Sequence, residues 1–221
     1  MLSVLQLVIA PQPVDGAPIG STGPERRAAN LAPRWGGQGI QPVVCYPRRG
    51  NLWSNFEKAG LTVIDFEIGN KFNWKAAWQI AAMVREHGVK VIHAQGPASL
   101  DLLAVLGGRL SGAPVALTRP VMLDDQVMYS AFRRRVYRLI DETITLKKAD
   151  AIVAVSEDGR RLMHYISRVS NDKLTLIHNG VDMGRFVVRT PTSADGNESG
   201  EPVTLGMVAQ LFPPKAWDDF I

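Results

Sequence analysis

The chain has 221 residues and a formal net charge of +4, from 25 Lys and Arg against 21 Asp and Glu. Apolar residues make up 46% of it and charged residues 21%, which is the composition of an ordinary globular protein and excludes a disordered chain. The small positive charge gives no reason to expect a nucleic-acid partner, and the single cysteine, Cys45, excludes a disulfide framework and is typical of a reducing compartment.

The chain begins with an apolar run, residues 1–10, that leads into Pro11 and Pro13. This run lacks a basic n-region and predicts a β-strand rather than a signal peptide. No apolar segment of the sequence approaches the roughly 18 to 20 residues that a membrane-spanning helix needs. We therefore expect a cytoplasmic protein.

Seven short runs rich in β-branched residues alternate with longer segments of helical spacing. The runs are Val4–Ile9, Pro42–Tyr46, Leu61–Phe66, Val89–Ala94, Pro114–Leu117, Ala151–Val155 and Leu174–Ile177. The helix starts are marked by Ser21 or Thr22 before Pro24, by Asn73, by Pro97 and by Ser156. Apolar strands that alternate with helices predict an α/β fold, a Rossmann-like doubly wound parallel sheet.

The composition changes after the seventh strand. Residues 189–202 hold no large apolar side chain and are rich in turn formers, which predicts a linker. A further strand, Val203–Val208, and a helix start at Lys215–Ile221 follow. We therefore expect an N-terminal domain over 1–188, the linker, and the first strand and helix of a truncated second domain over 203–221, which cannot bury its apolar face alone.

Ligands of an open parallel sheet bind outside the carboxyl ends of its strands. After the first strand, Gly16, Gly20 and Gly23 lead into a helix N-terminus that can hold a phosphate or carboxylate, although their spacing matches neither a dinucleotide fingerprint nor a P-loop. Polar residues also follow the fourth, fifth and seventh strands: His93, Gln95 and Gly96; Thr118, Arg119, Asp124 and Asp125; His178, Asn179, Gly180 and Asp182. We expect these residues at the floor of a cleft. A purely structural role is the alternative for each residue taken alone.

Metal and serine chemistry find no support in the sequence. The four histidines form no H-x-x-x-H pair and no second cysteine accompanies Cys45. A G-x-S-x-G elbow is absent from the sequence as well.

One predicted helix is both basic and amphipathic. It carries the cations Arg133, Arg134, Arg135 and Arg138 and the apolar residues Tyr129, Phe132, Val136, Leu139 and Ile140. Such a helix can lie on an anionic membrane surface, which predicts a possible peripheral membrane contact. The alternative is a solvated basic face opposite a stripe that is buried in the core.

Five phrases, taken in chain order, resemble the family-4 glycosyltransferases, which are retaining enzymes with two Rossmann-like domains in the GT-B arrangement. The phrases are Thr22–Arg26, Val91–Gly96, Ala149–Glu157, Ile177–Asp182 with Phe186, and Gly206–Lys215. They span nearly the whole chain in the order that the family shows.

This resemblance implies transfer of a sugar from a nucleotide-sugar donor to a glycan or lipid-linked acceptor, in polysaccharide, lipopolysaccharide or glycolipid assembly, with no cofactor and no metal. The first domain would shape the acceptor side of the cleft. His93 is implied as the catalytic candidate, which would orient the transferred sugar. The implied acceptor-site residues are Gly20, Gly23, Gln95 and Arg119, and Lys215 is implied to bind donor phosphate.

The sequence also departs from the family pattern. Gln210 stands where the family has an arginine on the diphosphate, and Gln95 stands where it has a second histidine. The acidic E-x(7)-E motif of the donor domain would fall beyond Ile221. A second hypothesis is therefore a non-catalytic acceptor-domain fragment or subunit that needs a separate donor domain. A sugar-nucleotide epimerase of the same architecture is a third, against which the N-G-V-D phrase counts.

Overall fold

The computed structural model describes residues 1–10, 21–69, 73–119, 131–181, 183–185 and 206. The chain divides into two compact units, Met1–Asn179 and Gly180–Ile221. The predicted linker, 189–202, and all of the segment 203–221 except Gly206 lie outside the described residues. The expected division into two domains therefore stays a prediction.

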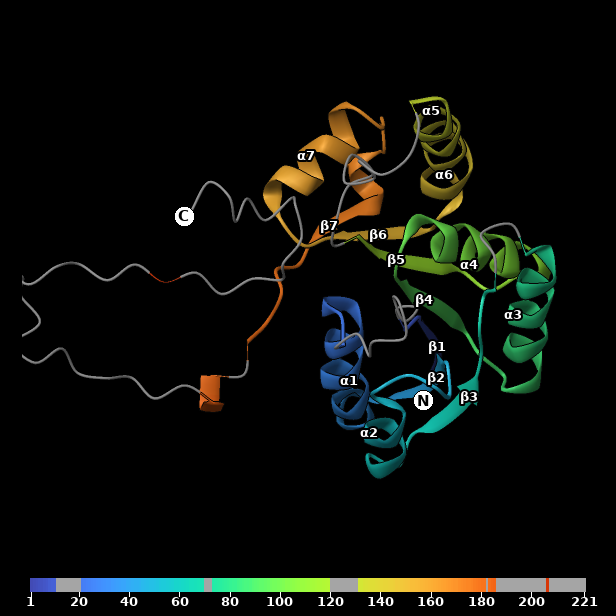
Figure 1. Cartoon of the computed structure of the whole chain (residues 1–221), viewed down its shortest axis with the longest axis vertical. Coiled ribbons are helices and arrows are strands. Elements are labelled where there is room, and N and C mark those ends of the chain that lie inside the picture. The colour runs from blue at the N-terminus through green and yellow to red at the C-terminus, as the bar shows by residue number, and fades with distance from the viewer. Residues whose placement is uncertain (11–20, 70–72, 120–130, 182, 186–205, 207–221) are drawn as a thin grey trace, which may run out of the picture. The chain divides into compact units, whose positions relative to one another are not determined.

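The first unit is built on one parallel sheet of seven strands (Figure 1). The strands are β1 (Leu2–Val8), β2 (Ile40–Tyr46), β3 (Thr62–Asp65), β4 (Val91–Gln95), β5 (Val115–Arg119), β6 (Ala151–Ala154) and β7 (Leu174–Leu176). Their spatial order is β3-β2-β1-β4-β5-β6-β7, and every neighbouring pair is parallel. Each strand overlaps its predicted run, so the predicted doubly wound sheet is confirmed. The strand order reverses between β1 and β4.

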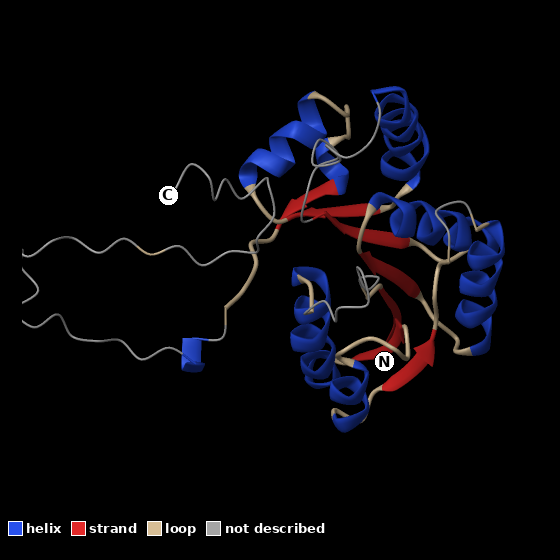
Figure 2. Ribbon diagram, in the orientation of Figure 1, coloured by secondary structure: helices blue, strands red, loops and turns tan. Residues whose placement is uncertain are grey.

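Helices cover both faces of this sheet (Figure 2). They are α1 (Gly23–Trp35), α2 (Trp53–Lys58), α3 (Trp74–Glu86), α4 (Ala98–Ser111), α5 (Ala131–Ile140), α6 (Leu146–Lys148) and α7 (Glu157–Tyr165), with a π-helical turn, η3 (Asp141–Thr145), between α5 and α6. Helices α1 and α2 lie on one face, and α3 and α4 lie on the other (Figure 1). Right-handed crossovers require this arrangement, because the chain leaves β1 in one direction to reach β2 and β3 and in the opposite direction to reach β4 and β5.

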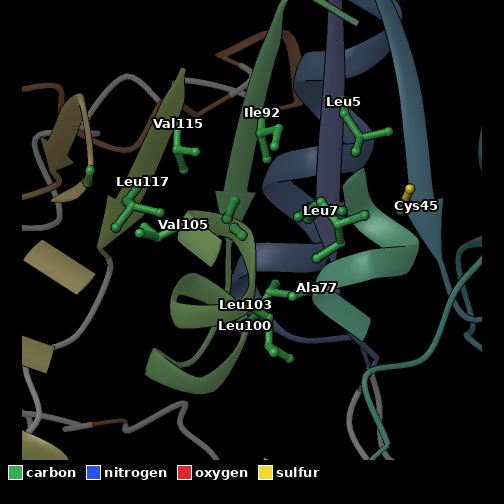
Figure 3. Packing of buried hydrophobic residues seen from close by; sticks show 14 of the residues in the cluster. Leu5, Leu7, Cys45, Ala77, Ile92, Leu100, Leu103, Val105, Val115 and Leu117 are labelled. Carbon is green, nitrogen blue, oxygen red and sulfur yellow. The ribbon is translucent and has the colours of Figure 1, made fainter. Parts of the chain in front are cut away.

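Side chains of the strands alternate between two apolar clusters. Leu5 and Leu7 of β1 lie in the larger cluster, with Ile92 of β4, on the side of α3 and α4 (Figure 3). Val8 lies in the smaller cluster, on the side of α1 and α2. Cys45 is fully buried in the larger cluster, as its apolar sequence context predicts. Burial of this apolar surface on both faces is the main force that stabilises the sheet.

The start of α1 is fixed to the end of β2 by a buried carboxylate. Glu25 is fully buried, and its Oε2 atom accepts hydrogen bonds from the backbone nitrogen of Thr22 (2.6 Å) and from the Thr22 hydroxyl (2.8 Å). The hydroxyl of Tyr46, at the end of β2, donates to the other oxygen of Glu25. The first turn of α1 therefore has a defined position over the carboxyl edge of the sheet.

The apolar stripe of α5 does not enter the core. Phe132, Val136 and Leu139 are 78%, 37% and 61% exposed, and Tyr129 lies outside the described residues. A solvated basic face opposite a buried stripe, the alternative weighed from the sequence, does not describe this helix. Apolar and basic side chains of α5 are exposed together.

Candidate functional site

The candidate site lies where the strand order reverses, beside β1 and β4. His93 and Gln95 of β4 point to the same face as Gln6 of β1, because side chains two residues apart share a face and Gln6 pairs with His93 in the register. Thr118 of β5 lies on that face as well, opposite Gln95 in the register. This is the face that α1 covers, and the carboxyl ends of β1 and β4 flank the switch point at which open α/β sheets bind ligands.

His93 is held as a neutral imidazole. Its Nε2 atom lies 2.8 Å from the hydroxyl of Thr118, and its ring centroid lies 5.7 Å from the ring of Trp35, the last residue of α1. Burial, with a smaller contribution from the positive charge of Arg27, lowers the pKa of His93 to about 4. Because a neutral imidazole has one donor and one acceptor, the second ring nitrogen, Nδ1, can accept from or donate to a ligand hydroxyl.

Two buried carboxamides lie beside His93 without partners. Gln6 and Gln95 are fully buried, and both amide atoms of each lack a hydrogen-bond partner among the described residues. Buried polar groups are nearly always paired, because each unpaired one costs about 1–3 kcal/mol. A polar ligand that supplied both donors and acceptors would satisfy these amides.

No sequence motif marks Gln6 or Arg27 as a site residue. Arg27, on α1, is partly buried, and its Nη1 atom is buried without a hydrogen-bond partner among the described residues. Its charge is close enough to His93 to lower the pKa of that residue. The spacing of four between Arg27, Leu31 and Trp35 is the signal that could have placed all three on one stripe of the helix.

Arg119 has partners on the opposite face of the sheet. It is 7% exposed, and its Nε atom lies 2.7 Å from Asp101 of α4. Two further nitrogens of the guanidinium lie 2.5 and 3.2 Å from the carboxylate of Asp141, the first residue of η3. Adjacent residues of a strand point to opposite faces, so the structure brings Thr118 to His93 and does not bring Arg119 to them.

The remaining predicted site residues are placed as follows. Gly23 is the exposed first residue of α1, and a side chain there would meet no atom within 4 Å. Gly20 and Lys215 lie outside the described residues. Within the described segments, no group of three or more His, Cys, Asp or Glu side chains is placed to hold a metal ion. None of the helices in those segments is long and apolar enough to cross a membrane.

Several solved structures share this fold. The chain matches a glycosyltransferase from Rickettsia africae with a TM-score of 0.61 and 20% identity, over 83% of this chain and 44% of that one. It matches HepE of Anabaena in complex with UDP and glucose with a TM-score of 0.62 and 14% identity, over 83% of this chain and 46% of that one. The UDP-GlcNAc 2-epimerase of Neisseria meningitidis bound to UDP-GlcNAc matches with a TM-score of 0.56 and 14% identity, over 79% and 46% of the two chains. The fold is thus the Rossmann-like half of a GT-B protein.

The family is defined by the sequence itself. The model of the glycosyl transferase 4-like domain matches residues 22–180, which is most of the chain. The chain belongs to this family of glycosyltransferases, as its five phrases predict. No curated protein matches the sequence. The chain spans 44% of the Rickettsia structure and 46% of the HepE structure, which is less than half of either length.

Proposed function

We propose that the chain is the acceptor-side half of a retaining glycosyltransferase that transfers a sugar from a nucleotide-sugar donor to a glycan or lipid-linked acceptor. The assembly of a polysaccharide, lipopolysaccharide or glycolipid is the proposed setting. Family membership supports the reaction class, and HepE of Anabaena was solved with UDP-glucose. The proposal needs neither a metal nor another cofactor, because the leaving diphosphate can be stabilised by cations and helix N-termini.

The observation that carries this proposal is the pair of unpartnered carboxamides around a neutral imidazole. Gln6 and Gln95 each offer a carbonyl acceptor and two amide donors, and His93 offers its second ring nitrogen, Nδ1. Sugar hydroxyls both donate and accept, so they match a site that mixes donors and acceptors. A site that recognises hydroxyl groups in this way strongly rejects analogues that lack them.

Calorimetry with UDP-glucose and a Gln95→Leu variant tests this site. Leucine has nearly the volume of glutamine and removes only the amide, so we expect binding at least tenfold weaker. Gln79→Leu is the matched control, because Gln79 is exposed on α3, on the other face of the sheet. Equal affinity of the two variants for UDP-glucose would contradict the assignment of the site.

A non-catalytic half that needs a separate donor domain is the second candidate; Gln210 stands where the resemblance implies an arginine on the diphosphate. A transfer assay with UDP-sugars and sugar acceptors separates the two. Turnover by the 221-residue chain would identify an enzyme. Ligand binding without turnover would identify an acceptor half.

We further propose that the protein works in the cytoplasm and contacts the inner face of an anionic membrane through α5. Phe132 and Leu139 are exposed on this helix together with Arg135 and Arg138. Apolar side chains that enter the headgroup region and arginines that meet anionic lipid are the two contributions that hold an amphipathic helix at an interface.

Vesicle sedimentation tests this contact. We expect the protein to bind phosphatidylglycerol vesicles at low salt and to bind phosphatidylcholine vesicles much more weakly. Phe132→Ala and Arg135→Gln should each reduce the bound fraction. Tyr165→Ala is the control, because Tyr165 is an aromatic residue of α7 that is 75% exposed. Equal binding to both lipids would contradict the electrostatic part of the proposal.

A further inference from the structure

We propose that Arg27 holds a phosphate group of the ligand at the site beside β1 and β4. Nothing in the sequence reasoning assigned a role to this residue. The inference rests on the proposed function for the identity of the ligand, and on the contacts of the described residues for the choice of Arg27.

The first step is that Arg27 differs from the other charged groups around the start of α1. Glu25 already accepts hydrogen bonds from Thr22 and Tyr46. The neighbouring Arg26 is exposed, and its Nε atom donates to the hydroxyl of Ser21. Arg27 instead keeps its Nη1 atom buried with no partner in the described part of the chain. A buried guanidinium nitrogen is costly to leave unpaired, and an anionic ligand atom would pair with it.

The second step is that Arg119 cannot take this place. Its guanidinium is shared between Asp101 and Asp141 on the opposite face of the sheet. Two carboxylates around one guanidinium leave no excess positive charge for a ligand. Arg27 lies instead on α1, the helix that covers the face of His93, and it keeps one buried guanidinium nitrogen without a partner among the described residues.

Other donors lie on the same face of the sheet, which α1 covers. Gln6 and Gln95 add unpartnered amide donors that are fully buried, and the amides at the start of α1 add the partial positive charge of a helix N-terminus. One cation and several donors suit a group with several oxygen acceptors and a negative charge. A phosphate fits this description, and arginine binds phosphate through two parallel hydrogen bonds.

Two molecules of the proposed reaction carry such a group: the diphosphate of a nucleotide-sugar donor and the phosphate of a lipid-linked acceptor. Calorimetry on the 221-residue chain separates these sources with UDP as one probe and farnesyl diphosphate as the other. Uridine, which lacks the phosphates, is the neutral control. We expect UDP, farnesyl diphosphate or both to bind at least tenfold more weakly to Arg27→Gln than to the wild-type protein. Arg27→Lys keeps the charge and loses the bidentate geometry, so its affinity for these probes should lie between those of the wild-type protein and Arg27→Gln.

Arg34→Gln is the matched control variant. Arg34 is exposed in the last turn of the same helix, where its Nη1 atom donates to the carbonyl of Asn30 at 2.5 Å. We expect this variant to bind both phosphate probes within twofold of the wild-type protein. Equal losses of affinity for the phosphate probes in Arg27→Gln and Arg34→Gln would show a non-specific effect of helix charge and would overturn the proposal.

A second readout is independent of ligand binding. NMR titration of the His93 ring should show a higher pKa in Arg27→Gln than in the wild-type protein, because the positive charge of Arg27 contributes to the low pKa of His93. An unchanged pKa would mean that Arg27 does not face His93, and the proposal would fail.

If the phosphate probes bind to wild type and Arg27→Gln equally while UDP-sugars still serve as donors, the role of Arg27 fails and the proposed function stands. If wild type binds UDP and farnesyl diphosphate no better than uridine, no phosphate is held here.

Discussion

The Nε2 atom of His93 and the hydroxyl of Thr118 lie 2.8 Å apart and join β4 to β5 on the face that α1 covers. The two residues are separated by the whole of α4, which forms the crossover between β4 and β5, so only the parallel pairing of the strands brings them together. This hydrogen bond occupies one ring nitrogen and fixes the orientation of the imidazole. Under the proposed function, the other ring nitrogen, Nδ1, is the atom that meets the ligand.

The stability of the protein should fall as the pH is lowered from about 6.5 to about 4. The folded-state pKa of His93 is about 4, below the ordinary value of 6.5 for an exposed imidazole, so the unfolded chain binds the proton more readily in this range. The contribution of His93 is fully present above the unfolded pKa and is lost as the pH falls toward the folded pKa. It amounts to at most about 3 kcal/mol. Urea unfolding of wild type and His93→Gln between pH 4 and pH 8 measures it, and an identical pH dependence of the two would contradict it.

Replacement of Gln6 by leucine should stabilise the fold and weaken ligand binding. The amide of Gln6 is fully buried and has no partner among the described residues, so its removal relieves an unpaired polar group and should add about 1 kcal/mol to the free energy of unfolding. Gln41→Leu is the control, because Gln41 is exposed on the neighbouring β2. Thermal melting together with UDP-glucose binding checks both halves of the prediction. A destabilised Gln6→Leu variant would mean that the amide has a structural partner.

The buried cluster of Arg119, Asp101 and Asp141 should respond unequally to substitution. Arg119→Met leaves two buried carboxylates without a counter-ion, and we expect a loss of about 3 kcal/mol or more. Asp101→Asn should cost much less, because burial already raises the pKa of Asp101 to about 7 and Asp141 still pairs with the guanidinium. Denaturant unfolding of both variants at pH 7 tests this order. A larger loss of stability in Asp101→Asn than in Arg119→Met would contradict this order.

Helices α3 and α4 should separate when a methyl group is added at Gly107. A Cβ atom there would lie 2.5 Å from the Cγ2 atom of Ile80 and 3.2 Å from the carbonyl oxygen of Ala77. Overpacking of this kind typically costs about 1–3 kcal/mol, so Gly107→Ala should lower the melting temperature. Gly37→Ala is the matched control, because a Cβ at Gly37 meets no atom within 4 Å and should leave the melting temperature near that of wild type.

Local pattern was sufficient to predict the fold class. Each of the seven strands is a short apolar run, and Pro97 and Ser156 are residue types that mark a helix start. The hydroxyl of Ser156 accepts a hydrogen bond from the backbone nitrogen of Gly159 at 3.1 Å. Such signals depend on neighbours within a few residues, which the sequence displays directly. The rule that parallel strands bind ligands at their carboxyl ends then placed His93 and Gln95 in one region.

The sequence by itself therefore determined the parallel sheet, its helices, the family and the place of His93 and Gln95 on one strand. The tertiary structure alone decided which buried polar groups lie together: Gln6 lies beside His93 in the strand register, whereas Arg119 pairs with Asp101 and Asp141. It also decided that the apolar stripe of α5 is exposed. The physical reason is that pairing and burial depend on which face of a strand or helix meets another element. Those contacts join residues far apart in the chain, which no local pattern specifies.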